Sequence, residues 1–180
     1  RRKAASLINM PEMKLPDKKL IMNILKEMAA PAYAKSEKLF ILLMMKMVIV
    51  SLKYGLTKNS SAAFGMYGMI LGPFLGNYSL AYEFGKLSLQ LSEKYNDASE
   101  ICFSSYVFGS YINHWIKHVK TDTQYLAKGV QAGLESGDFS YAGYSAATHI
   151  AVMRFKGDNL DDIINQCRTY LGLLEKIKHA

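Results

Sequence analysis

The sequence predicts an all-α protein in which antiparallel helix pairs stack into an α-α superhelix. Half of the 180 residues are hydrophobic and 21% are charged, which is typical of a packed core and excludes a disordered chain. Short β-branched runs such as residues 47–50 lie inside longer helical patterns, so no strand is expected. Helix pairs recur about every 40 residues, the spacing of repeat proteins whose neighbouring units complete one another's core.

The first third of the chain predicts a basic segment followed by two helices. Residues 1–19 show weak periodicity and are expected to be a linker or a frayed end. A short helix is predicted over Leu20–Met28, stopping before Pro31 because the residue before a proline disfavours helix. Ser36 is a suitable N-cap for the next helix, which should run to about residue 54 and end at Gly55.

The rest of the chain predicts three helix pairs, at about 60–97, 98–138 and 139–178. In each pair a first helix rich in small residues precedes an amphipathic second helix. Together with the preceding helices these pairs should form one repeat domain over residues 20–180. No single pair could bury its own apolar face, so stacking must complete the core.

Glycine stripes in the first and second helix pairs predict close helix–helix contact. Glycine costs a helix about 1 kcal/mol relative to alanine, so a stripe of glycines indicates a geometric need. The two stripes comprise Gly65, Gly68, Gly72 and Gly76, and then Gly129 and Gly133. Pro73 interrupts the first stripe and should kink that helix or end it early.

The most apolar run, Leu39–Leu52, is 14 residues long and contains Lys46. A membrane span needs about 20 apolar residues, so this run predicts a buried helix, and no membrane partner is expected. Cys102 and Cys167 lie in helical patterns without metal-type spacing. Two reduced core thiols in a cytoplasmic protein are the expectation.

The net charge of +7 is concentrated in residues 1–60, which carry 12 Lys/Arg and 4 Asp/Glu. Such a segment could bind nucleic acid or an acidic partner surface. Alternatively, the lysines keep an apolar helical segment soluble. No aromatic residues interleave with the lysines of 14–26, as a groove for single-stranded nucleic acid would require, so nucleic acid is not an expected partner.

The motifs of common catalytic and metal sites are missing. The glycine-rich stretch at 65–76 lacks the lysine and Ser/Thr of a phosphate-binding loop. His114 and His118 are four residues apart on an expected helix, but a third metal ligand is not evident. Neither cysteine has an evident activating histidine. We therefore expect no enzyme activity, no metal and no cofactor.

Tyrosines are the candidate binding residues. Tyr106, Tyr111, Tyr141 and Tyr144 fall on the expected first helices of the later pairs. In two-helix solenoids these helices usually line the concave face, and tyrosine suits a binding groove. With His114 they form the candidate interaction set. The alternative is that they are ordinary inter-helix packing residues with their hydroxyls at the rim.

Four stretches carry a family resemblance: residues 80–94, 109–115, 133–144 and 160–178. They resemble the TPR-like helical region of very large bacterial signalling proteins. Those proteins join a Ser/Thr-kinase-like domain, an AAA-type ATPase, this helical region, a GAF domain and often a histidine kinase. The resemblance covers about residues 20–178, and it implies a helical connector or docking platform. The catalytic motifs of those domains are not in this chain, so no catalytic residue carries over.

Two hypotheses follow. The first is a non-catalytic TPR-like scaffold that relays signals between domains of a multidomain kinase or ATPase. Its partners would be other domains of the same parent chain, or a protein or peptide in the concave groove. The alternative is a solenoid of an ATP-dependent regulator that senses a small-molecule effector in the same groove.

Overall fold

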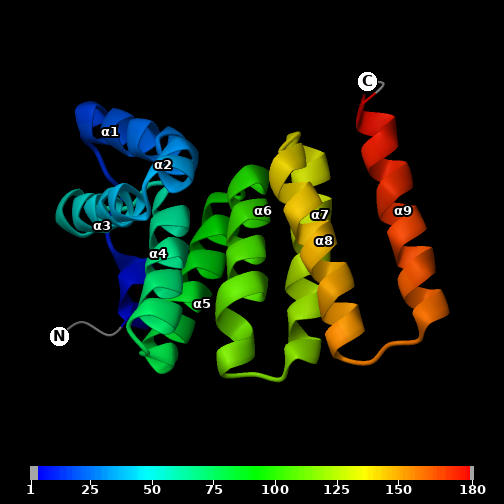
Figure 1. Cartoon of the computed structure of the whole chain (residues 1–180). Helices are drawn as coiled ribbons and strands as arrows, with labels where there is room; N and C mark the ends of the chain where they lie inside the picture. Colours follow the sequence, from blue (N-terminus) through cyan, green and yellow to red (C-terminus); the bar gives the residue numbers. More distant parts are fainter. Residues whose placement is uncertain (1–3, 179–180) are drawn as a thin grey trace.

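A computed structural model describes residues 4–178, without the side chains of residues 174 and 176–178, and within that range it is all-helical (Figure 1). The only pairing of β type among these residues is an isolated bridge between Glu12 and Leu56. The expectation of an all-α protein is confirmed. The α-helices are α1 (Pro16–Glu27), α2 (Ala29–Lys35), α3 (Glu37–Tyr54), α4 (Ser60–Met69), α5 (Tyr78–Tyr95), α6 (Ala98–Val107), α7 (Asp122–Ser136), α8 (Phe139–Phe155) and α9 (Leu160–Lys178).

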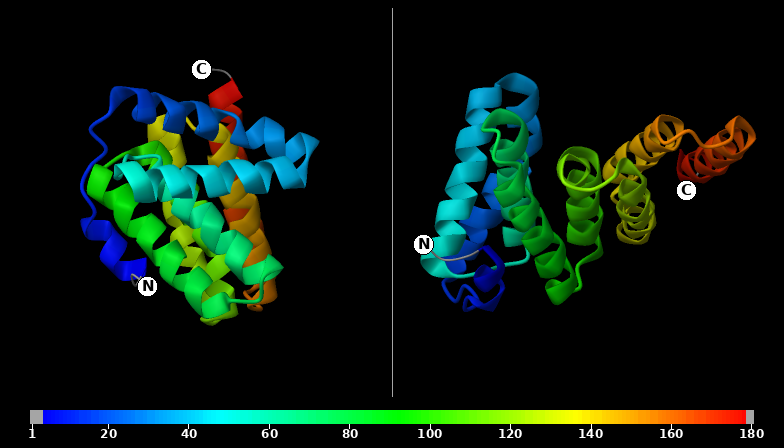
Figure 2. Two further views of the ribbon diagram at one scale, coloured as in Figure 1. Left: turned by 90° about the vertical axis from the view of Figure 1, so that its left-hand side faces the viewer. Right: turned by 90° about the horizontal axis from the view of Figure 1, so that it is seen from below.

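Helices α4 to α9 lie side by side in chain order, each in contact with the next (Figures 1 and 2). In Figure 1, α4, α6 and α8 form the front of this row, and α5 and α7 lie behind them. Helices α1, α2 and α3 lie across the α4 end of the row (Figure 2). Short helical turns complete the chain: η1 (Ala4–Asn9), η2 (Ile70–Phe74), η3 (Phe108–Ile112), η4 (Asn113–Trp115) and η5 (Val119–Thr121).

Residues 4–15 are packed against the core, so the prediction of a linker or frayed end is wrong for them; residues 1–3 lie outside the described part. Leu7 and Met13 are buried. The backbone N–H of Met13 donates to the carbonyl of Leu56 at 2.8 Å. Gly55 allows this approach, because its φ is +104° and a Cβ there would lie 2.6 Å from the carbonyl oxygen of Pro11. The sequence pattern missed this segment because its contacts are to a distant loop.

Pro31 lies inside a helix and does not follow a helix end. Helix α1 ends at Glu27, as expected, but α2 begins only two residues later and contains Pro31 in its first turn. Proline is tolerated there because the first backbone N–H groups of a helix have no acceptor within it. The capping of α3 is confirmed: the N–H of Leu39 donates to the Ser36 hydroxyl at 3.4 Å, and the helix ends at Gly55.

The glycine stripes bring neighbouring helices together, as predicted. A Cβ on Gly65 would lie 2.7 Å from the Ser88 hydroxyl of α5. A Cβ on Gly133 would lie 2.7 Å from the Cβ of Ala142 in α8. At Gly133 only glycine permits this separation, whereas at Gly65 a larger residue would displace the Ser88 hydroxyl, and Gly72 would accept a Cβ at 3.4 Å from its nearest neighbour. Gly65 and Gly133 therefore mark close approaches in the row.

Gly76 does not belong to the first stripe. Pro73 lies in the π-helical turn η2, which ends the straight part of the helix as predicted. Gly76 follows this turn with a φ of +67°, and a Cβ there would contact nothing. It serves the turn between α4 and α5 and not a helix contact.

Candidate functional site

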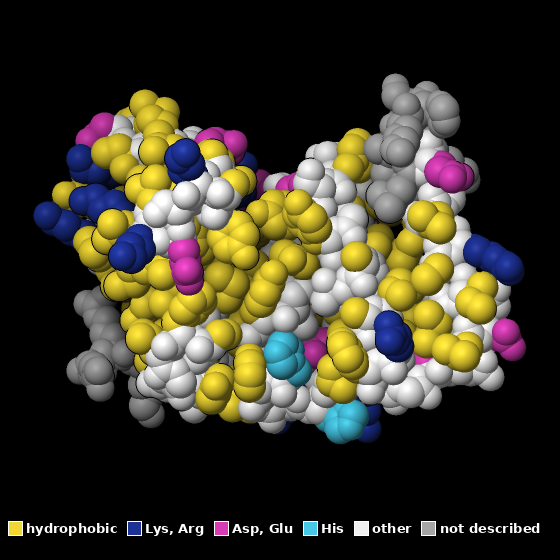
Figure 3. Space-filling model, viewed as in Figure 1, with side chains coloured by type: hydrophobic (Ala, Val, Ile, Leu, Met, Phe, Trp, Pro, Cys, Tyr) yellow, Lys and Arg dark blue, Asp and Glu magenta, His cyan; other side chains and the backbone are white. Residues whose placement is uncertain are grey.

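A concave groove runs along the front of the molecule, between the α1–α2 wall and the front helices α4, α6 and α8. It contains a cavity of about 200 Å³. Hydrophobic side chains cover much of the hollow in the middle of this face (Figure 3). The cavity is lined by Lys26, Glu27, Ala29, Ala30, Met44, Met47, Ala62, Met66, Ser99, Phe103, Asp138 and Tyr141.

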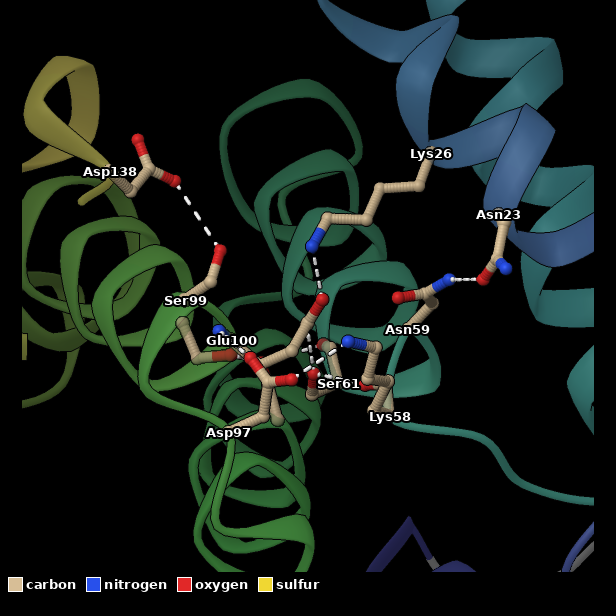
Figure 4. A network of polar contacts seen from close by, with 11 residues as sticks. Asn23, Lys26, Lys58, Asn59, Ser61, Asp97, Ser99, Glu100 and Asp138 are labelled. Carbon is tan, nitrogen blue, oxygen red and sulfur yellow. Dashed lines mark hydrogen bonds and ion pairs between the residues drawn. The ribbon is translucent and has the colours of Figure 1, made fainter. Parts of the chain in front are cut away.

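A buried ion pair connects α1, in the wall of this groove, to α6, in its floor. Glu100, in the first turn of α6, has a fully buried side chain. Its carboxylate accepts hydrogen bonds from the Lys26 ammonium of α1 and from the Ser61 hydroxyl of α4 (Figure 4). A buried carboxylate is tolerated only when it is paired and hydrogen-bonded. The three residues therefore hold α1, α4 and α6 together at one end of the groove.

A second, more exposed pair lies beside the first. The carboxylate of Asp97 caps α6 by accepting from the N–H of Glu100 at 3.1 Å, and it pairs with Lys58 at 2.8 Å (Figure 4). Burial acts to raise the pKa of Asp97, but the hydrogen bonds from Lys58 and from the N–H of Glu100, together with the charges of Lys58 and Lys26, outweigh burial and leave that pKa below its ordinary value. The hydrogen bond with Asp97 raises the pKa of Lys58 in turn. Asp97 thus stays ionised and stabilises the start of α6.

The four predicted tyrosines come together on the front helices. The ring of Tyr106 lies 5.7 Å from that of Tyr141 and 5.9 Å from that of Tyr144, and its hydroxyl is 3.1 Å from the Tyr111 hydroxyl. Phe103 contacts Tyr141 edge-on at 4.8 Å and connects this tyrosine cluster to the cavity. Burial raises the pKa of Tyr141 to about 12 and also raises that of Tyr106. The cluster is therefore an uncharged aromatic surface with hydroxyl groups.

Among the described contacts, His114 meets Asp122 and Trp115 and none of the tyrosines of the cluster. Its Nδ1 lies 3.5 Å from the carboxylate of buried Asp122, at the start of α7. The Asn113 amide also donates to Asp122, at 2.6 Å. These contacts draw the chain away from helical geometry: α6 ends at residue 107, and residues 113–115 form a 3₁₀ turn. The expected helix carrying both His114 and His118 is therefore wrong.

The Lys26–Glu100 pair could not be predicted from the local sequence pattern. The two residues are 74 positions apart. Glu100 follows an Asp97 cap by three residues, which is the ordinary place for an exposed acidic residue at the start of a helix. Its contacts with Lys26 of α1 and Ser61 of α4 accompany its burial. A polar contact of Ser61, by contrast, could be predicted, because Ser61 lies in the first turn of a helix.

The buried thiol and the acidic residues offer little reactive chemistry. Burial raises the pKa of Cys102 to about 12, with a smaller contribution from Asp138, so its thiol stays protonated. Within residues 4–178, no three His, Cys, Asp or Glu side chains are arranged to hold a metal ion.

Among the helices described, none has the length and apolar character needed to cross a bilayer.

Comparison with known proteins gives one distant similarity. No family model matches the chain, and no solved structure matches it. The chain is 29% identical over 147 residues to the hybrid signal transduction histidine kinase G of Dictyostelium discoideum. The similarity covers 80% of this chain but only 4% of that much longer protein. The chain is thus distantly similar to a small part of a signal transduction histidine kinase.

Proposed function

We propose that the chain is a non-catalytic, TPR-like helical-repeat module of a signal transduction protein, which binds a protein or peptide segment in its concave groove. The distant similarity to a hybrid histidine kinase supports the signalling context. The row of alternating front and back helices supports the interpretation of the fold as an α-α superhelix (Figure 1). The partner would be another domain of the same parent chain or a separate protein.

The observation that carries this proposal is the tyrosine cluster beside the cavity. Tyr144 is 56% exposed, whereas Tyr106 and Tyr141 are half-buried beneath it. Partly exposed aromatic side chains with polar ends are enriched in protein interfaces because they bury a large area with little loss of rotamer freedom. Tyrosines supported by other tyrosines also need little rearrangement on binding, which reduces the entropic cost.

The size of the groove cavity favours a peptide over a small effector in the groove, although a separate cavity of about 420 Å³ lies between α2, α3 and η2. Sites for drug-sized ligands have volumes of about 300–1,000 Å³. The cavity in the groove measures about 200 Å³, which suits one or two inserted side chains. The Lys26–Glu100 pair fixes the wall beside it, so the groove is preformed.

Selection of peptides from a random display library on the immobilised chain tests the proposal. Selected peptides should bind Tyr144→Ala roughly tenfold or more weakly than the original chain, because truncation of an interface aromatic costs about 1–2 kcal/mol or more. Phe74→Ala is the control, since Phe74 is an exposed aromatic residue of η2 that lines neither the groove cavity nor the tyrosine cluster. Failure to select any peptide, or equal loss in both variants, would contradict groove binding.

A further inference from the structure

The outward face of α3 exposes a stripe of large apolar side chains. Leu42 is 67% exposed and Ile49 is 53% exposed; Leu52 is also exposed and Met45 is half-buried. These four residues, here called the α3 seam, are spaced by three, four and three positions. That spacing is the one by which a helix presents a continuous stripe to a second helix lying along it.

Lysines accompany the seam and no acidic residue does. Lys46 and Lys53 lie along one flank of the seam, and Lys38 lies in line with it one turn earlier. Residues 38–53 contain no Asp or Glu. None of these three lysines forms an ion pair with a described residue; Lys53 lies over the Tyr54 ring at 5.1 Å. Lysines gather over the α1–α3 end of the molecule among hydrophobic side chains (Figure 3).

The α3 seam is separate from the concave groove. Met44 and Met47, which line the cavity, project from the opposite side of α3. That inner side also carries the fully or nearly buried residues of the helix, which pack on the core. A partner on the seam would therefore leave the groove open.

We propose that the α3 seam docks an amphipathic helix of a protein partner, with apolar residues along its contact stripe and acidic residues beside them. The apolar stripe of the partner helix would bury Leu42 and Ile49, and the partner's carboxylates would pair with Lys46 and Lys53. Exposed Leu39 lies beyond the lysines on the same helix, so an anionic bilayer is the alternative occupant, and the vesicle experiment below distinguishes it from a helix. The seam itself is a stripe about 80° wide, which fits the contact stripe of a second helix. It has no aromatic residue on which nucleic acid bases could stack. An acidic helix fits both the shape and the charge.

Fluorescence anisotropy with synthetic peptides of about three heptads tests this proposal. The first peptide carries Leu and Ile along one stripe and Glu beside it. The second has Lys in place of every Glu, and the third is the first with its sequence scrambled. The first peptide should bind at least about tenfold more tightly than either of the others, because only it combines the stripe with opposite charge.

Two charge-reversal variants locate the site. Lys46→Glu/Lys53→Glu should weaken binding of the Glu peptide by at least about tenfold and allow the Lys peptide to bind. Lys117→Glu/Lys120→Glu makes the same change of net charge at exposed positions elsewhere and should leave binding within about twofold. All four substituted side chains are exposed, so far-UV circular dichroism should stay unchanged.

Three outcomes would overturn the proposal. One is equal binding of the Glu peptide and its scrambled form, which would show attraction by charge alone. Another is equal weakening by the two variants. The third is capture by phosphatidylcholine–phosphatidylserine vesicles that depends on Lys46 and Lys53 while the Glu peptide does not bind, which would assign the seam to a lipid surface. None of these outcomes bears on peptide binding in the groove.

Discussion

Replacing Lys26 by methionine should destabilise the protein far more than loss of an ordinary surface lysine. The change removes the only ammonium group that is hydrogen-bonded to the fully buried carboxylate of Glu100 among the described residues. The Ser61 hydroxyl remains hydrogen-bonded to it, and Lys58 interacts with it only through its charge. Removing one member of a buried pair costs about 3–5 kcal/mol, because the other charge stays desolvated. The Lys26 side chain is 26% exposed, so water can approach the vacated side. We therefore expect the free energy of unfolding to fall by about 2–3 kcal/mol.

Urea unfolding followed by far-UV circular dichroism measures this loss. Lys58→Met is the matched control: its partner Asp97 is part-exposed and its own side chain is 56% exposed, so the cost should stay below about 1 kcal/mol. The double variant Lys26→Met/Glu100→Leu should recover most of the loss, because it removes the buried charge and fills its place with apolar atoms. Equal losses in Lys26→Met and Lys58→Met would refute the reasoning, since they would show that Glu100 is solvated.

Three further predictions concern packing, pH and thiol reactivity. Gly133→Ala should lower the melting temperature, because its Cβ would lie 2.7–3.0 Å from atoms of neighbouring segments; Gly143→Ala has open space and should raise stability by up to about 1 kcal/mol. Burial lowers the pKa of His149 below its ordinary value of 6.5, with a smaller contribution from Lys156. The folded state therefore takes up this proton less readily than the unfolded state. Neutral His149 contributes fully to the free energy of unfolding above about pH 6.5, and this contribution is lost as the pH falls below that value. In urea titrations at a series of pH values, His149→Gln should make the free energy of unfolding depend less on pH. At pH 8 a disulfide reagent such as dithionitrobenzoate should modify half-buried Cys167 well before Cys102, whose pKa is about 12; faster reaction of Cys102 would show that its helix opens readily.

The sequence predicted what depends on neighbouring residues. Ser36 caps α3 and Gly55 ends it because caps and stops act within one helical turn. The close approach at Gly133 could also be predicted, since a glycine stripe has few other uses in a helix. The clustering of tyrosines followed from placing the front helices correctly.

The missed features all depend on contacts between distant segments. Met13 is buried only because residues 10–13 lie against the α3–α4 loop. The Glu100 carboxylate is buried where Lys26 of α1 and Ser61 of α4 meet it. His114 leaves the helix because Asn113 and Asp122 form a polar contact across a turn. Local pattern cannot distinguish these residues from exposed ones, because burial is set by which helices meet.

Equivalent caps begin α6 and α8, but the residues that follow those caps differ in chemistry. Asp97 and Asp138 cap α6 and α8 in the same way, each accepting from the N–H of the third residue after it. Glu100 and Tyr141 therefore occupy equivalent positions. In α6 this position faces α1 and carries the carboxylate that binds the wall. In α8 it lines the cavity and carries an aromatic ring that packs on Phe103 and Tyr144. The equivalent position thus serves assembly in α6 and supports the exposed Tyr144 in α8, so we expect the proposed binding surface to lie toward α8 and not along the whole row.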